Sequence, residues 1–348
     1  MNLLGDEQLA HVEAHLRSVL SRLLRAEGLS RVNQIITDYV LAGGKRIRPQ
    51  LCVWTHSIAG AGGAHGDALL DLACVWEIFH AFLLAHDDII DDSDLRRDQP
   101  SLHRRLESLD GHSPKFGANL AIVAGDLLFS SAVRLLHELD VPAAIYREQL
   151  KLFSRIACTT GFGQAIDICQ SHAPLTKIPE ELLLREYHWK TAAYTFEGPM
   201  LSGAILAGMN AQGQREISRY ALALGQAYQL QNDLIDLAGD VHEGCDIVQG
   251  KRTITLMRAR AAMDEQTRSA FDRKLAELKS ANGHTLTIAQ ALRIELRQAG
   301  AVDRTRELIE SFLADARKSA ASDALPDALR GGMIAMLESL QTQYFARA

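Results

Sequence analysis

The sequence predicts an all-α protein, a bundle of roughly ten or more helices. Apolar residues recur at three- and four-residue spacing along most of the 348 residues, whereas alternating, strand-like runs are scarce. Only 8 prolines interrupt the chain, so long stretches can remain helical. The apolar periods do not continue as heptads, which argues against a coiled coil. Because 47 % of the residues are hydrophobic and no long linker is present, we expect one domain over residues 1–348.

Clusters of glycine, proline and polar residues mark the expected ends of the helical segments. In chain order these breaks lie at 42–49, 59–66, 109–117, 171–180 and 280–285. The glycines of the second break do not form a dinucleotide-binding fingerprint, because no strand precedes them and His65 stands where the last glycine of GxGxxG belongs. His11 and His15 have no third ligand nearby, which favours a solvated helix face over a metal site.

Charge, hydropathy and cysteine content exclude several classes of protein. The net charge is −6 and lysine and arginine are spread along the chain, so the composition indicates no nucleic-acid partner. The N-terminus lacks a signal-peptide core, and the longest apolar stretch, ANLAIVAGDLLF (118–129), is too short to span a bilayer. The five cysteines form no CxxC pair and are expected to be buried thiols. We therefore expect a cytoplasmic protein without a transmembrane segment.

Two helical segments carry a similar acidic pattern, HDDIID in the first half of the chain and QNDLID in the second. Positions i and i+4 of a helix share a face, so Asp87 converges with Asp91, and Asn232 with Asp236. Two such helices facing each other across a bundle would line a cavity with oxygen atoms, which suit Mg²⁺ bound together with substrate phosphates. A solvated acidic helix end is the alternative interpretation of each segment.

Basic residues near these segments favour the phosphate-binding interpretation. They gather in short groups: Lys45, Arg46 and Arg48; Arg96 and Arg97; Lys251 and Arg252. Acidic runs that served only solubility would not need these groups. His80 lies about two helical turns before Asp87, on roughly the same face. The segment KTAAYTF (190–196) adds an ammonium and a hydroxyl group where a helix could be broken.

Together these motifs resemble those of the trans-isoprenyl diphosphate synthases, the polyprenyl synthetase family. The matching segments are GGKRIRP, DDIIDDSDLRR, GQAIDI, KTA, YQLQNDLID and GKRT. They stand in the family's order and cover roughly residues 30 to 260. The resemblance implies an isoprenoid synthase-type helical bundle around a deep central cavity, usually as a homodimer. It also implies a short-chain enzyme similar to geranylgeranyl and farnesyl diphosphate synthases.

The resemblance assigns roles residue by residue. The expected metal ligands, for three Mg²⁺ ions with substrate bound, are Asp87, Asp91, Asn232 and Asp236. The expected catalytic residues are Asp87, Asp88, Asp91, Lys190 and Asp233. Isopentenyl diphosphate would be held by Lys45, Arg48, His80 and Arg97. The allylic diphosphate would be held by Arg96, Lys190, Thr191, Gln229 and Lys251.

The implied reaction is a Mg²⁺-dependent prenyl transfer. Diphosphate leaves the allylic carbon while metal ions and basic side chains stabilise the charge that develops on its oxygens. The double bond of isopentenyl diphosphate then attacks the allylic cation, and the departed diphosphate takes up a proton. No protein nucleophile is needed, but the cavity must exclude water because water would capture the cation.

The chain departs from the family pattern at several positions. Asn232 stands where an aspartate is usual, Asp98 replaces a glycine, and the loop after Asp240 is short and lacks a lysine. NDLIDLAGD also resembles the second metal motif of terpene cyclases, which share the fold. A cyclase and a non-catalytic partner subunit are therefore the alternatives. Magnesium-dependent turnover of isopentenyl diphosphate separates all three, since a cyclase needs no isopentenyl site.

Aromatic residues before the first acidic motif bear on product length. Phe82 is the fifth residue before Asp87, where a bulky side chain shortens the product in this family. Phe79 and Trp76 follow at about one-turn intervals and could equally be core residues. The first motif lacks the two-residue insertion of many fifteen-carbon bacterial synthases. We expect Phe82, with Phe79, to form the cavity floor, and a twenty-carbon product slightly ahead of a fifteen-carbon one.

Overall fold

A computed structural model of the chain describes residues 2–60, 66–96, 99–109, 111, 113–171, 173–240, 245–278 and 285–346. Most of these residues are helical; their strands are the antiparallel pair β1 (Leu95–Arg96) and β2 (Gln99–Pro100). The predicted all-α class is confirmed. Contacts divide the chain into two compact units: unit 1 comprises Met1–Ser154 and Gly198–Gln214, and unit 2 comprises Arg155–Glu197 and Arg215–Ala348. The single domain expected from the sequence stays a prediction.

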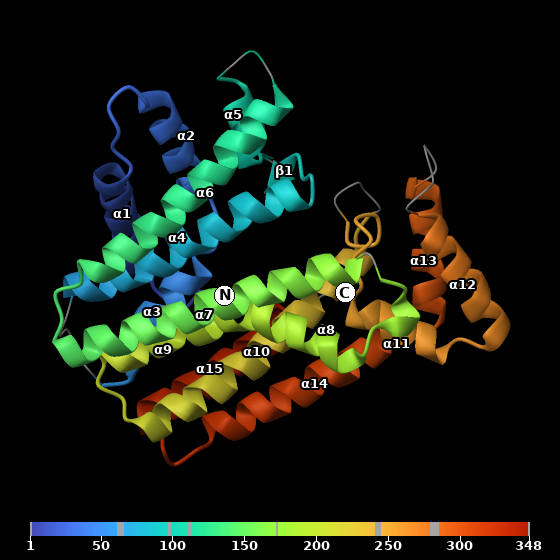
Figure 1. The fold of residues 1–348 in the computed structure, drawn as a ribbon. Coiled ribbons are helices and arrows are strands. Elements are labelled where there is room, and N and C mark those ends of the chain that lie inside the picture. The colour runs from blue at the N-terminus through green and yellow to red at the C-terminus, as the bar shows by residue number, and fades with distance from the viewer. Residues whose placement is uncertain are drawn as a thin grey trace. The chain divides into compact units, whose positions relative to one another are not determined.

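Unit 1 is built around one long apolar helix, α4. Its helices are α1 (Asp6–Leu23), α2 (Ser30–Leu41), α3 (Ile47–Ile58), α4 (Gly66–Ile90), α5 (Leu102–Glu107), α6 (Pro114–His137), the first part of α7 (Ala143–Ser171) and α9 (Gly198–Leu206). Helix α4 packs beside α3 and α6, and α3 packs beside α9 (Figure 1). Most residues in the middle of α4 are buried, so this helix carries its acidic end on a rigid support.

Unit 2 holds the second acidic motif at the end of α10 (Ala211–Ala238). Its other elements are η1 (Leu175–Lys177), α8 (Glu180–Glu186), the π-helix η2 (Tyr187–Glu197), α11 (Ile254–Ala262), α12 (Glu265–Glu277), α13 (Thr285–Gln298), α14 (Ala301–Ala320) and α15 (Asp327–Gln343). Helix α15 is bound to α10, because the buried Tyr220 hydroxyl donates to the Met333 carbonyl at 2.9 Å. Helices α14 and α15 form an antiparallel pair (Figure 1).

Two helices of unit 1 are long and apolar enough to span a bilayer by length and composition. They are α4, with a mean hydropathy of 1.8 over its most apolar window, and α6, with 1.5. The expectation that the longest apolar stretch, 118–129, is too short was wrong, because it lies within α6, which is 24 residues long; the expected absence of a transmembrane segment stays a prediction. In α4, 72 % of that window is buried inside the protein, as in the core helix of a soluble domain; in α6 the share is 39 %. Length and hydropathy alone are weak evidence for a span.

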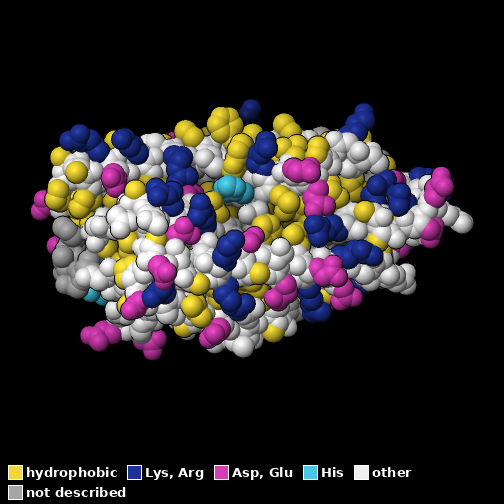
Figure 2. All heavy atoms as spheres, turned by 90° about the horizontal axis from the view of Figure 1, so that it is seen from below, with side chains coloured by type: hydrophobic (Ala, Val, Ile, Leu, Met, Phe, Trp, Pro, Cys, Tyr) yellow, Lys and Arg dark blue, Asp and Glu magenta, His cyan; other side chains and the backbone are white. Residues whose placement is uncertain are grey.

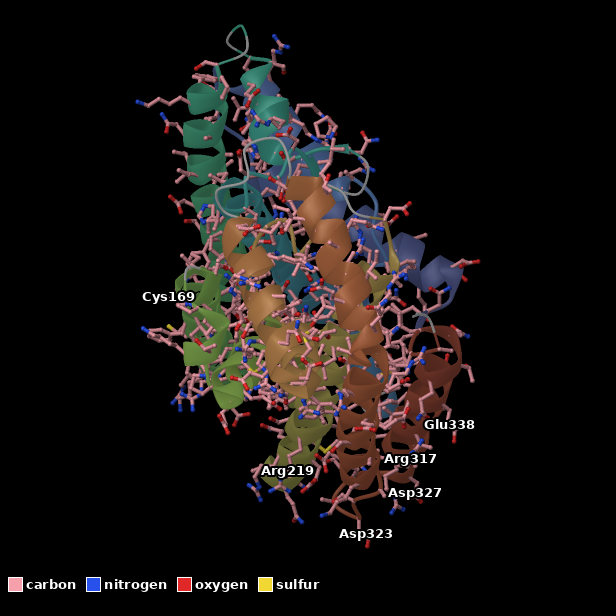
Figure 3. All side chains as sticks on the ribbon, turned by 90° about the vertical axis from the view of Figure 1, so that its right-hand side faces the viewer. Cys169, Arg219, Arg317, Asp323, Asp327 and Glu338 are labelled. Carbon is pink, nitrogen blue, oxygen red and sulfur yellow. The ribbon has the colours of Figure 1, made fainter. Side chains whose placement is uncertain are left out.

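The cysteines divide into buried and exposed thiols. Cys52, Cys74 and Cys245 are buried, and burial raises the pKa of Cys52 well above its ordinary value. Cys158 and Cys169 lie on α7 and are exposed; Cys169 is labelled near the end of that helix in Figure 3. The expectation of five buried thiols was wrong for these two, because they occupy the outer face of a helix.

Charged side chains of both signs are mixed on the described surface. On the face shown in Figure 2, lysine and arginine lie among aspartate, glutamate and apolar side chains. Local pairs account for part of this mixing: Arg219 on α10 is 2.7 Å from Glu216, and Arg330 on α15 binds Asp323 and Asp327. Such surface pairs stabilise a fold little.

Candidate active site

The first acidic motif lies where α4 ends. The Asp91 amide donates to the Asp87 carbonyl at 2.9 Å, and Asp92 has a left-handed backbone with φ 49°, so the helix stops inside the motif. The C-terminus of a helix carries partial negative charge, and carboxylates placed there are destabilising until cations neutralise them. Asp87 and Asp91 are partly exposed, which leaves their oxygens accessible to a metal ion.

Asp88 points the other way and is completely buried. It accepts hydrogen bonds from Arg96 Nε at 2.8 Å and from the Tyr39 hydroxyl at 3.3 Å. Burial raises the pKa of Asp88, and the Arg96 guanidinium opposes that rise. Arg96 also lies 3.7 Å from Asp87, which it partly neutralises. The geometry is therefore that of an anchor for Arg96, and a catalytic role for Asp88 stays a prediction.

The residues expected to bind isopentenyl diphosphate also belong to unit 1. Lys45 is exposed, whereas Arg48 and His80 are buried. His80 lines a small cavity of about 20 Å³ together with Arg96 and Arg105. The structure thus brings His80 and Arg96 to the same space. Arg97 lies outside the described residues.

Arg46, which sequence reasoning left without a role, anchors the loop that carries Lys45. It has a left-handed backbone with φ 49°, and its buried guanidinium donates to the carbonyls of Val40 and Leu41 at 3.0 Å each. It also donates to Glu77 of α4 at 2.7 Å. These bonds fix the GGKR segment to the end of α2 and to α4. The GGKR motif drew attention to Arg46 in the sequence, but a motif does not show whether a residue anchors the loop or binds a ligand.

The aromatic residues upstream of Asp87 form one cluster in unit 1. The ring centroid of Phe82 lies 5.7 Å from that of Phe79 and 5.2 Å from that of Phe129 on α6. Phe153 on α7 packs against Phe79 at 5.3 Å and against Trp76 at 5.7 Å. Phe79 and Trp76 are fully buried and belong to the core, while Phe82 is partly exposed. Phe82 is therefore the better candidate for contact with a product chain.

In the second acidic motif, Asn232 is bound by a residue near the C-terminus. The Tyr344 hydroxyl donates to Asn232 Oδ1, and the Tyr344 ring stacks on Tyr228 with 4.8 Å between centroids. Sequence reasoning missed Tyr344 because it lies over 100 residues from the motif. The amide oxygen can coordinate Mg²⁺, but a metal ion must share it with this hydroxyl or displace the hydroxyl.

Asp233 is buried, as Asp88 is, and it too accepts from a tyrosine. The Tyr187 hydroxyl donates to Asp233 Oδ2, and Gln229 Nε2 donates to Oδ1 at 3.0 Å. Burial raises the pKa of Asp233 well above its ordinary value, and nearby Asp246 adds to the rise. Asp88 and Asp233 each follow the first expected metal ligand of their motif. One residue further along a helix is turned by about 100°, so both side chains point into the protein. A catalytic role for Asp233 stays a prediction.

Asp236 lines a small cavity in unit 2, which has about the same volume, 20 Å³, as the cavity beside His80 in unit 1. Asp246, Lys251 and Arg293 line it as well. The Lys251 ammonium lies 3.8 Å from Asp246. Arg293 of α13 is buried, and its Nη2 has no hydrogen-bond partner among the described residues. The cavity therefore combines carboxylates with two cations. Arg293 lies outside every motif of the sequence, so only the folded chain reveals its place.

The remaining residues expected to bind the allylic diphosphate lie on and beside η2. Lys190 forms an ion pair with Asp167 of α7, and the Thr191 hydroxyl donates to Gln229 Oε1 at 3.0 Å. Glu186 is buried, and this burial raises its pKa well above the ordinary value. Asp167 and Glu186 were absent from the predicted site, although Asp167 belongs to the GQAIDI segment that carried the resemblance.

The described residues fit Mg²⁺ better than a transition metal. Among them, no three histidine, cysteine, aspartate or glutamate side chains converge as a preformed metal site. Magnesium needs none, because it keeps several waters and binds through a few carboxylates and substrate phosphates. Asp87, Asp91, Asp236 and Asn232 carry hard oxygen atoms of this kind, and their role as metal ligands stays a prediction.

Comparison with known proteins decides the family. The model of the polyprenyl synthetase family matches residues 30–292. The chain belongs to this family. It is 33 % identical to a farnesyl diphosphate synthase of Geobacillus stearothermophilus over 67 % of this chain and 74 % of that protein. It is 31 % identical to a geranylgeranyl diphosphate synthase of Pantoea ananas over 80 % of this chain and 88 % of that protein.

A solved structure of a related protein supports the fold over most of the chain. The geranylgeranyl pyrophosphate synthase of Corynebacterium glutamicum, crystallised with isoprenyl diphosphate and magnesium, superposes with a TM-score of 0.81 at 27 % identity. The superposition covers 96 % of this chain and 98 % of that one. The predicted family, the predicted isoprenoid synthase-type fold and the predicted enzyme class, a transferase of prenyl groups, are confirmed.

Proposed function

We propose that this polyprenyl synthetase condenses isopentenyl diphosphate with an allylic diphosphate and releases diphosphate. The product would be a trans-polyprenyl diphosphate of about fifteen to twenty carbons, as the names of the similar proteins indicate. The observation that carries the proposal is the pairing of acidic and basic groups within each unit. Arg96 lies beside Asp87 in unit 1, and Lys251 shares a cavity with Asp236 in unit 2.

The roles of the side chains follow from their charge and position. Asp87, Asp91, Asn232 and Asp236 would hold Mg²⁺, with three ions expected when substrate is bound. When bound, Mg²⁺ stabilises the negative charge that grows on the leaving diphosphate. The residues expected to bind the allylic diphosphate include the ammonium groups of Lys190 and Lys251 and the guanidinium of Arg96, which would act as charge-assisted partners of its phosphates.

Isopentenyl diphosphate would bind to the basic groups of unit 1. Lys45 is exposed and lies on the anchored GGKR loop, Arg48 follows at the start of α3, and His80 lines the cavity shared with Arg96. A charged partner in a bound phosphate contributes about 1.5–3 kcal/mol. A prenyl acceptor site of this kind has no use in a cyclase.

We also propose that the enzyme is a cytoplasmic homodimer in which α6 faces a second copy. Ile122, Val123, Leu127 and Val133 of α6 are 45 %, 51 %, 45 % and 37 % exposed and share one side of the helix. An apolar strip of this kind on a helix of a soluble enzyme is typical of an interface. Light scattering should give twice the chain mass for the wild type and one chain mass for Leu127→Lys. A monomeric wild type would contradict this part of the proposal.

The proposed reaction is tested by incubation with labelled isopentenyl diphosphate, Mg²⁺ and one allylic primer at a time. Primers of five, ten and fifteen carbons cover the expected range. We expect elongated products of up to about twenty carbons and no product after chelation of Mg²⁺. A terpene hydrocarbon from the primer alone would indicate a cyclase. No turnover of either substrate by the pure chain would indicate a partner subunit.

A further inference from the structure

The π-helix η2 carries two residues assigned to the allylic diphosphate, Lys190 and Thr191. It spans 11 residues, Tyr187–Glu197, which is long for a conformation that usually appears as a single turn. A π-helix is less favourable than an α-helix, so packing against neighbouring elements must hold it. The position of Lys190 and Thr191 therefore depends on what touches η2.

Two glycines allow neighbouring helices to reach the backbone of η2. A Cβ atom added to Gly163 of α7 would lie 2.4 Å from the amide nitrogen and 2.8 Å from the Cα of Lys190. A Cβ atom added to Gly225 of α10 would lie 2.5 Å from the Cβ of Ala192. Both distances are shorter than atoms tolerate, and the obstacle at Gly163 is backbone that cannot rotate away. Two helices thus contact η2 at positions 190 and 192.

The helix α7 touches Lys190 twice. Gly163 meets its backbone, and Asp167, one turn later on the same face, forms an ion pair with its ammonium. Together the two contacts fix both the backbone and the ammonium group of Lys190. A shift of its backbone would move the ammonium away from the place where Asp167 holds it.

The ends of η2 are also held. At its start, the Tyr187 hydroxyl donates to the buried Asp233. At its end, the buried Glu197 accepts from the two terminal nitrogens of Arg155 at 3.0 and 3.2 Å and from the Ser218 hydroxyl at 2.7 Å. The two-pronged arginine pair is the more rigid of these contacts, because it fixes direction as well as distance.

We propose that Gly163 is a positioning residue for the allylic diphosphate. Its missing side chain lets α7 contact the Lys190 backbone and so sets the register in which η2 presents Lys190 and Thr191. Glu197, held by Arg155, keeps the far end of the same segment in place. This inference rests on the proposed function, because it takes from it the role of Lys190 and Thr191.

The test compares Gly163→Ala with Gly161→Ala. Both glycines lie within α7 two residues apart, and both substitutions add one methyl group to a helix. A Cβ atom at Gly161 has no neighbour within 4 Å, so this variant is the matched control. We expect Gly163→Ala to raise KM for the allylic diphosphate by about tenfold or more, because a small misplacement of a binding group is costly. KM for isopentenyl diphosphate should stay unchanged, and Gly161→Ala should resemble the wild type in both.

A second readout does not depend on turnover. Hydrogen–deuterium exchange of residues 187–197 in the ligand-free protein should be faster in Gly163→Ala than in the wild type and unchanged in Gly161→Ala. An inactive wild type would refute the proposed function, while the exchange would still report whether Gly163 holds η2. Equal rises in both KM values, or an unchanged allylic KM, would overturn the positioning role.

Gly163→Ala could also fail to fold. In that case Glu197→Gln, which keeps the size of the side chain and removes the charge paired with Arg155, should raise the allylic KM severalfold without changing the isopentenyl KM. An unchanged allylic KM in this variant would then overturn the proposal.

Discussion

Replacing Phe82 with alanine should lengthen the product by at least one isoprene unit. The Phe82 ring packs against Phe79, Phe129 and His86 with centroid distances of 5.7, 5.2 and 4.9 Å. The substitution removes a six-carbon ring, and each further elongation adds five carbons, so the space gained matches one unit. Burying five carbons is worth about 4 kcal/mol, and we expect about half of this because Phe82 is only partly buried. About 2 kcal/mol would favour further addition over release by roughly 30-fold.

The assay measures products made from labelled isopentenyl diphosphate and a fifteen-carbon primer. After removal of the diphosphate, reversed-phase chromatography separates the alcohols by length. Trp76→Ala is the control: it removes a core ring whose Nε1 donates to Ser202 at 2.8 Å, so it should lower thermal stability without lengthening the product. Identical product distributions from Phe82→Ala and the wild type would refute Phe82 as the floor.

Three further predictions concern charge. Lys45→Ala should raise KM for isopentenyl diphosphate and Lys190→Ala that for the allylic diphosphate, each about ten- to hundredfold, because each loses a charged phosphate partner. Steady-state kinetics with each substrate varied would check this, and the reverse pattern would show that the pockets are exchanged. Asn232→Asp should lower the Mg²⁺ concentration that gives half the maximal rate, because a carboxylate replaces an amide dipole at the metal. A Mg²⁺ titration in which the variant needs an equal or higher concentration would refute the assignment of Asn232 as a weak ligand. Burial raises the pKa of Glu186 above its ordinary 4.5, so the folded protein binds a proton there more tightly than the unfolded chain does. The resulting contribution to the free energy of unfolding is fully present below pH 4.5 and is lost as pH rises toward the folded-state pKa. Thermal melts should therefore show Glu186→Gln gaining on the wild type as pH rises above 4.5, and a constant difference would count against the raised pKa.

The helical class and both acidic motifs could be predicted because they depend on local spacing. Asp87 and Asp91 lie at the end of α4, and Asn232 and Asp236 near the end of α10, as the i, i+4 pattern indicates. Spacing also places the next residue of each motif off that face. It does not reveal that this residue is buried, because burial depends on what packs there.

Other parts of the site depend on contacts between distant segments. Tyr344 reaches Asn232 from the last turn of the chain, and Arg293 reaches the cavity of Asp236 from a helix without a motif. No local pattern encodes either contact. The π conformation of η2 was also beyond prediction, because the residues that contact it, such as Gly163 of α7 and Gly225 of α10, lie far from it in the sequence.

Diphosphate release, measured with each substrate alone and with both together, directly tests whether the enzyme condenses the two substrates. We expect Mg²⁺-dependent release only when isopentenyl and allylic diphosphates are both present, with one diphosphate formed for each isopentenyl unit consumed. In Asp87→Ala this rate should fall by about two orders of magnitude or more, because a metal ligand at the developing charge is lost. Release from the allylic substrate alone would contradict the proposed condensation, and an Asp87→Ala rate within twofold of the wild type would contradict the role of Asp87 as a metal ligand.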